Sequence, residues 1–103
     1  MSEVRLALEA RDELNEAASW YEARSEGLGS ELLDEVEEVL QRIGALPDSF
    51  PRLLDVPDDL EIRRALLPRF PYALVFVSTA VDIQVIAVAH TKRRPGYWLD
   101  RIG

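Results

Sequence analysis

The stretch IRRALLPRFPYALVFVSTAVDIQVIAVAH, residues 62–90, decides the fold of this chain. It contains three runs rich in β-branched and aromatic residues, which predict strands at 62–66, 72–78 and 83–89. Pro68-Arg69-Phe70-Pro71 predicts a turn between the first two runs, because neither proline has the N–H that a central strand donates. A polar turn over 79–82 separates the last two. The sequence therefore predicts a three-stranded antiparallel unit.

Two helices are expected before this unit. In residues 10–26, Leu14, Ala17, Ala18 and Tyr21 fall at helical spacing, and Gly27 is expected to end the helix in the left-handed conformation. Ser30 is the expected N-cap of the second helix, which Gly44 and Pro47 end. Its expected apolar stripe is Leu32, Leu33, Val36, Val39, Leu40 and Ile43. So short a break predicts an antiparallel helical hairpin.

A further strand is expected at the start of the chain, where Val4, Leu6 and Leu8 alternate with other residues. Residues 47–60 contain three prolines and predict an irregular connection. The resulting order, β-α-α-β-β-β, predicts an α+β fold in which the hairpin covers one face of a mainly antiparallel sheet.

Length and composition restrict the class of protein. The 103 residues predict one domain over 1–103, and they include no cysteine, which excludes disulfides and thiolate chemistry. No apolar run is long enough to span a bilayer, and the charged start MSEVRLALEARDEL is unlike a signal peptide, so we expect a cytoplasmic protein.

Charge is distributed unevenly within a net charge of −7. Residues 1–61 contain seventeen acidic side chains and five arginines, whereas residues 62–103 contain seven basic side chains and two aspartates. This asymmetry predicts a local positive surface formed by the last part of the chain, unless the two halves neutralise each other.

The candidate functional residues lie in that basic part. We expect Arg63 and Arg64 to point to opposite faces of the sheet, because side chains alternate along a strand. The other candidates for phosphate or target binding are Arg69, Lys92 and Arg94. Arginine suits this role because its planar guanidinium binds phosphate through two hydrogen bonds.

Three further residues, His90, Arg93 and Tyr97, are candidates for catalysis. His90 can transfer a proton near neutral pH, and Tyr97 can do so if nearby arginines lower its pKa. Structural roles compete with these: Arg63 and Arg69 are equally well explained by pairing with carboxylates of the hairpin, and His90 by packing. Packing is likewise the first expectation for Trp20, Tyr21, Tyr72, Phe76 and Trp98.

No metal site or cofactor is expected. The chain has one histidine and no glycine-rich phosphate loop, and the acidic cluster Asp34, Glu35, Glu37 and Glu38 has the spacing of a solvated helix face.

Three blocks of the sequence resemble the RelE/ParE superfamily of toxins, whose members are often called plasmid-stabilisation proteins. The blocks are EARDELNEAASWYEARSEGLGSELLDEVEEVLQRI, IRRALLPRFPYALVF and IQVIAVAHTKRRPGYW, and they cover most of the chain in the order of the family. The resemblance implies the same β-α-α-β-β-β fold. It also implies a cognate antitoxin, whose extended or helical segment we expect to fill a groove between the hairpin and the sheet.

The resemblance leaves two targets open. RelE-like members cut mRNA on the ribosome without a metal, and Arg63, His90, Arg93 and Tyr97 match positions of that set. ParE-like members share the fold and poison DNA gyrase without catalysis. The acidic composition and the absence of a lysine-rich middle segment, where LLDVPDDLE stands, favour the gyrase poison. A ribosome-dependent endoribonuclease, or a member that binds antitoxin without toxicity, is the alternative.

Overall fold

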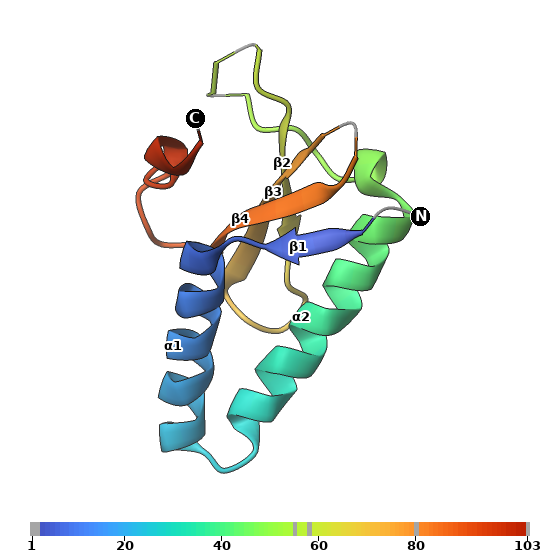
Figure 1. Cartoon of the computed structure of the whole chain (residues 1–103). Helices are drawn as coiled ribbons and strands as arrows, with labels where there is room; N and C mark the ends of the chain where they lie inside the picture. The colour runs from blue at the N-terminus through green and yellow to red at the C-terminus, as the bar shows by residue number, and fades with distance from the viewer. Residues whose placement is uncertain (1–2, 55, 58, 80, 103) are drawn as a thin grey trace.

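The computed structural model describes residues 3–54, 56–57, 59–79 and 81–102. Its elements run in the order β1 (Val4–Leu6), α1 (Leu8–Arg24), α2 (Leu28–Ala45), β2 (Ile62–Leu66), β3 (Tyr72–Ser78) and β4 (Ile83–His90). Short 3-10 turns occupy Pro47–Ser49 and Leu99–Arg101. The antiparallel hairpin of α1 and α2 lies on one side of the sheet (Figure 1). This is the predicted α+β fold, with each of the later strands at its predicted place.

The sheet has the strand order β1-β4-β3-β2. Strands β2, β3 and β4 are antiparallel neighbours as predicted, but β1 pairs with β4 in parallel, so the sheet is mixed. A β-bulge interrupts the register between β3 and β4, where Phe76 faces Val85 and Val75 faces Ala87. Ile86 is thus the extra residue, and both Ile86 and Ala87 lie in the core that covers the face away from the helices.

The core has two parts, one on each face of the sheet. The larger part lies between the hairpin and the sheet and contains Leu14, Leu32, Val36, Leu74 and Phe76. The smaller part lies on the other face, which we call the open face, beneath parts of 53–60 and the C-terminal segment 91–102. Trp98 is buried there as predicted. The connection over 47–60 is irregular as expected; Asp55 and Asp58 within it, and Ala80 in the predicted 79–82 turn, lie outside the described residues.

The start of the chain differs from the prediction in one respect. Leu8 is the first residue of α1 rather than part of β1, and its side chain is 71% exposed. The last hydrogen bond between the start of the chain and β4 is donated by the Ala7 N–H to the Val85 carbonyl oxygen, and the strand pairing ends there. Consequently β1 covers only the first part of β4.

The helix break also differs from the prediction. Gly27 is left-handed as expected, with φ of 88°, but α2 begins directly after it at Leu28, so Ser30 is not the N-cap. The Glu22 carboxylate takes the capping role, because it accepts hydrogen bonds from the Gly27 and Gly29 N–H groups. Gly29 lies so close to α1 that an added Cβ would stand 2.6 Å from the Ala18 carbonyl oxygen.

Three side chains on the helices are placed differently from the prediction. Leu33 of the predicted stripe and Trp20 are largely exposed, and the Arg24 guanidinium stacks 3.3 Å from the Trp20 ring centre. Glu35, predicted to be solvated, is buried. No helix among the described residues is long and apolar enough to cross a membrane.

Candidate functional site

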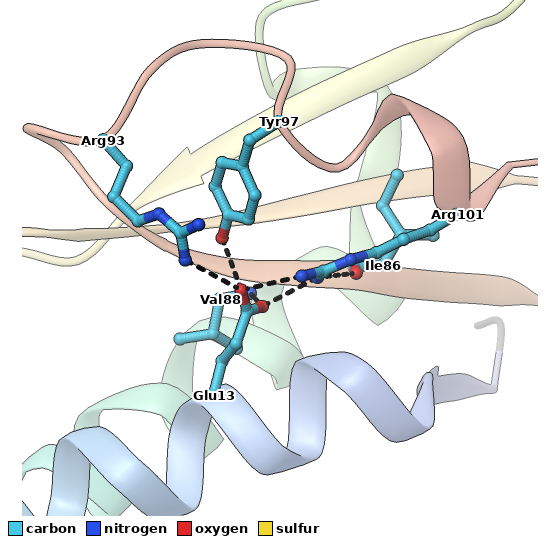
Figure 2. A network of polar contacts seen from close by, with 6 residues as sticks. All are labelled: Glu13, Ile86, Val88, Arg93, Tyr97 and Arg101. Carbon is cyan, nitrogen blue, oxygen red and sulfur yellow. Dashed lines mark hydrogen bonds and ion pairs between the residues drawn. The ribbon is translucent and has the colours of Figure 1, made fainter.

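Glu13 of α1 is the centre of a polar network that reaches β4 and the C-terminal segment (Figure 2). Its Oε1 accepts hydrogen bonds from the Val88 N–H at 3.0 Å and from Arg101 at 2.9 Å. Its Oε2 accepts the Tyr97 hydroxyl at 2.6 Å and a second nitrogen of Arg101 at 3.0 Å, and lies 3.7 Å from an Arg93 nitrogen. One carboxylate therefore connects α1, β4 and the C-terminal segment.

The network sets the ionisation of its members. Burial by itself raises the pKa of Glu13, but hydrogen bonds from Arg101, Tyr97 and Val88 outweigh it and hold that pKa below its ordinary value. Burial and the Glu13 carboxylate raise the pKa of Tyr97 to about 12, despite the two neighbouring arginines. The two arginines lower the pKa of Tyr97 by less than burial and Glu13 raise it, so the condition for proton transfer by Tyr97 is not met and the phenol stays protonated at neutral pH.

Arg93 is stacked as well as paired. Its guanidinium lies 3.7 Å from the centre of the Tyr97 ring, and its side chain is 55% exposed. Arg101, which the sequence did not single out, is far more buried and donates a further hydrogen bond to the Ile86 carbonyl oxygen. Arg101 thus holds the end of the chain against β4.

Three of the predicted basic residues gather at one groove on the open face. Arg64, Arg93 and Arg94 line a cavity of about 320 Å³, together with His90 and Tyr97. Its apolar lining includes Ala73, Val75, Ala89 and Trp98. Leu54 at this groove is 91% exposed. The groove thus joins an apolar surface to three guanidinium groups.

Arg63 lies away from this groove. As predicted, Arg63 and Arg64 are on opposite faces, but Arg63 is the one turned inward, with a side chain only 13% exposed. It donates hydrogen bonds to the Phe50 carbonyl oxygen and to Glu61, and lies 3.8 Å from Asp48. The structure gives Arg63 a structural role at the edge of the sheet.

Arg69 is also paired with carboxylates, here those of the hairpin. It contacts Glu31 at 3.2 Å and the buried Glu35 at 3.4 Å, and its backbone N–H donates to Glu35 as well. The predicted positive surface is therefore divided: Arg64, Arg93 and Arg94 share the groove, whereas Arg63 and Arg69 hold other parts of the fold together.

His90 lies at the end of β4 between two cavities. Its ring packs edge to face on Tyr72, and its Nδ1 accepts the N–H of the exposed Lys92. It lines the open-face groove and also a second cavity of about 360 Å³ between α1 and the sheet, which Trp20, Tyr21 and Arg93 line too. A groove between the hairpin and the sheet was expected, and this cavity occupies that place.

Glu13, Glu35 and Arg101 are the important residues that the sequence analysis missed. The helical spacing of the two glutamates is a signal that places them on the buried side of their helices. Glu13 lies three residues after Ala10 and four before Ala17, both of which are buried. Glu35 has the same spacing from Leu32 and Val39, which are also buried. Among the described residues no group of three histidine or carboxylate side chains is arranged to hold a metal ion.

Comparison with known proteins extends the description of the fold. No protein-family model matches the sequence, and no curated protein is similar enough to match. Solved structures do match, among them a chain of the structure described as the chromosomal ParDE TA system from P. aeruginosa, with 19% sequence identity and a TM-score of 0.63. The match covers 87% of this chain and 96% of that one. The chain thus shares its fold with that chain of the ParDE structure.

Proposed function

We propose that this chain is the toxin of a type II toxin–antitoxin pair and that it acts, ParE-like, as a non-catalytic poison of DNA gyrase. The fold supports the toxin class, because the similar chain belongs to a structure described as a ParDE TA system. The observation that carries the choice of target is the Glu13 carboxylate, which engages both Tyr97 and Arg93.

Metal-free RNA cleavage needs a group that removes a proton from the 2′-hydroxyl and cations that stabilise the developing charge. Tyr97 does not supply the base at neutral pH, because its pKa is raised to about 12. Arg63 and Arg69 are occupied by carboxylates. Only His90 is left among the candidate proton carriers, so a binding function fits this set better than catalysis.

The proposed target-binding surface is the open face. Arg64, Arg94 and Lys92 are exposed there or next to it, and Leu54 adds apolar area. A surface with an apolar centre and an arginine rim is typical of protein interfaces. The proposed cognate antitoxin would keep the toxin inactive in the complex.

A gyrase assay tests the target. Purified toxin added to gyrase and plasmid DNA is expected to inhibit supercoiling and to trap double-strand breaks, whereas Arg64→Ala with Arg94→Ala should weaken both effects. Arg5→Ala, an exposed arginine on β1, is the matched control. Normal supercoiling at saturating toxin would rule out the gyrase target. Harmless expression without the antitoxin would instead favour the non-toxic alternative.

One observation favours a ribosome-dependent endoribonuclease as the second candidate. Arg64, Arg93, Arg94 and His90 do line a single groove beside Tyr97 and Trp98, as a binding site for unpaired bases would require. Purified ribosomes with a defined mRNA test it. Cleavage at fixed codon positions that His90→Ala abolishes would establish this function, and intact mRNA would exclude it.

A further inference from the structure

The groove on the open face has a floor of small side chains. Strands β3 and β4 are rich in large apolar residues, yet Ala73 and Ala89 lie directly opposite each other in their register. Opposite residues of a sheet have Cβ atoms about 4.5–5.5 Å apart, so two methyl groups leave a hollow that larger side chains would fill. Both alanines line the cavity of about 320 Å³. The hollow therefore follows from the strand register.

The C-terminal segment forms a wall of this hollow. Trp98 packs into the open-face core and lines the cavity, and Val75 of β3 continues the apolar floor. Gly96 also lines the cavity, and its φ of 81° makes a turn just before Trp98. Because Gly96 has no side chain, the turn adds no bulk to the cavity. Pockets for small molecules have such apolar linings and begin at about 300 Å³.

Guanidinium groups reach the rim of the hollow from two sides of β3. Arg64 of β2 lies beside Val75 in the register, and Arg94 follows the end of β4. Neither Arg64 nor Arg94 forms an ion pair among the described residues. Arg93 also lines the cavity and lies over the Tyr97 ring, where Figure 2 shows it. The rim thus offers hydrogen-bond donors of one charge sign.

The contrast between floor and rim restricts the class of ligand. Sugar hydroxyls or base nitrogens lying on the methyl groups of Ala73 and Ala89 would lose their hydrogen bonds to water without replacement there, which is unfavourable. An apolar group gains by burial on the same floor. At the rim, a guanidinium binds a carboxylate through two parallel hydrogen bonds. This combination favours an apolar body that carries one carboxylate.

We propose that the open-face groove binds a small amphipathic carboxylate. Its aromatic or branched apolar body occupies the hollow over Ala73 and Ala89, and its carboxylate binds Arg64 and Arg94. This site is defined by the chain alone and goes beyond the proposed function. Where that function holds, the acid covers the surface assigned to the target, so acid and target should compete.

The test uses 3-phenylpropionate as the probe. The chain has two tryptophans, so Trp20→Phe leaves Trp98 as the only indole, and its fluorescence reports on the groove. The uncharged 3-phenylpropanamide should bind about tenfold more weakly than the acid, because it loses the hydrogen bonds between two charged groups. Acetate has no apolar body and should give no saturable change. In the isotope-labelled protein, the acid should shift the methyl signals of Ala73 and Ala89.

Variants of the protein locate the two parts of the site. Ala89→Leu fills the hollow and should weaken binding of the acid by about tenfold or more, with an amide NMR spectrum to check its fold. Arg64→Gln with Arg94→Gln should make the acid and the amide bind equally, while binding of the amide stays unchanged. Arg5→Gln, an exposed arginine on β1, is the matched control and should keep the wild-type preference. If Ala89→Leu does not fold, the arginine variant decides.

Several outcomes would overturn the proposal: no saturable binding of 3-phenylpropionate, equal binding of acid and amide to the wild type, or shifts confined to the cavity between α1 and the sheet. Tighter binding of adenosine monophosphate than of the acid would also overturn it, in favour of a nucleic-acid site. These measurements contain neither gyrase nor ribosomes. A chain that binds the acid but leaves supercoiling normal would therefore contradict the proposed function alone.

Discussion

The Tyr97 hydroxyl donates a 2.6 Å hydrogen bond to Glu13 Oε2, a contact between two residues 84 positions apart. Through this contact and the two bonds from Arg101, the C-terminal segment is held on the first helix. The basic end of the chain is thus positioned by an acidic residue near its start. Glu13 thus engages two of the seven basic side chains of residues 62–103, Arg93 and Arg101.

The ionisation of Tyr97 provides the first prediction. Its phenol should titrate with a pKa of about 12, because burial and Glu13 both oppose the phenolate. The pKa of the Tyr97 phenol can be measured by ultraviolet absorbance during an alkaline titration. The absorbance change that the wild type shows and Tyr97→Phe lacks belongs to Tyr97. Tyr72→Phe is the control and should leave the transition of Tyr97 at about pH 12 in place. A Tyr97 phenol with an ordinary pKa would show that the Glu13 contact is absent in solution.

The Glu13 carboxylate predicts a dependence of stability on acid. Because its pKa is lower in the folded chain than in the unfolded chain, the ionised form stabilises the fold. This contribution should be complete above about pH 4.5, the ordinary value, and should disappear as the pH falls through the lower folded pKa. The difference in unfolding free energy between the wild type and Glu13→Gln, measured with urea, should therefore be constant at neutral pH and shrink in acid. A difference that grows in acid would contradict this assignment.

The two glycines at the break between the helices, Gly27 and Gly29, should respond differently to substitution. Gly29→Ala should cost about 1–3 kcal/mol, because the new Cβ meets the Ala18 carbonyl and forces the helices apart. Gly27 has open space around its Cα but a φ of 88°, so Gly27→Asn should cost little, since asparagine tolerates that conformation. Urea unfolding measures both. Equal losses for Gly29→Asn and Gly27→Asn would show that the close helix approach is wrong.

The pair Glu35 and Arg69 should be unequal partners. Glu35→Ala leaves the part-buried Arg69 backbone N–H without its acceptor, which should cost about 1–3 kcal/mol. Arg69→Ala keeps that backbone bond and removes the exposed pair with Glu31, worth about 1 kcal/mol or less, and the 3.4 Å contact with Glu35, so it should cost less than Glu35→Ala, which removes both bonds to the Glu35 carboxylate. The unfolding midpoints of the two variants give the comparison. A larger loss from Arg69→Ala would mean that the ion pairs dominate.

The fold was largely predictable because its elements rest on local patterns. The three later strands and the hairpin follow from the spacing of apolar residues and from proline and glycine positions. The parallel neighbour of β4 was not predictable in this way, because strand order depends on contacts between distant residues. Leu8 shows the same limit: its alternation with Leu6 continues the pattern of a strand, yet the bond from Ala7 to Val85 ends β1 first.

The candidate site was predictable only as a list of residue types. The sequence identified Arg64, Arg93 and Arg94, which share the groove, but it gave no means of separating them from Arg63, whose partners Phe50 and Asp48 are brought in by the fold. The glutamates that decide these roles looked like ordinary surface acids. Their position within an apolar stripe is the feature that distinguishes them, and it can be sought in other sequences.

The single extra residue at Ile86 has a further consequence for how variation in this strand should be interpreted. If side chains alternated regularly from Val85, Val88 would lie on the open face. Because Ile86 is an extra residue, Val88 lies in the core beneath the hairpin and Ala89 lies in the core of the open face. If the bulge straightened with every residue kept, Val88 and His90 would exchange sides although the composition would be unchanged, whereas deletion of Ile86 would restore regular alternation and leave both on their present sides. The bulge at this one point therefore determines which surface of the molecule the histidine serves.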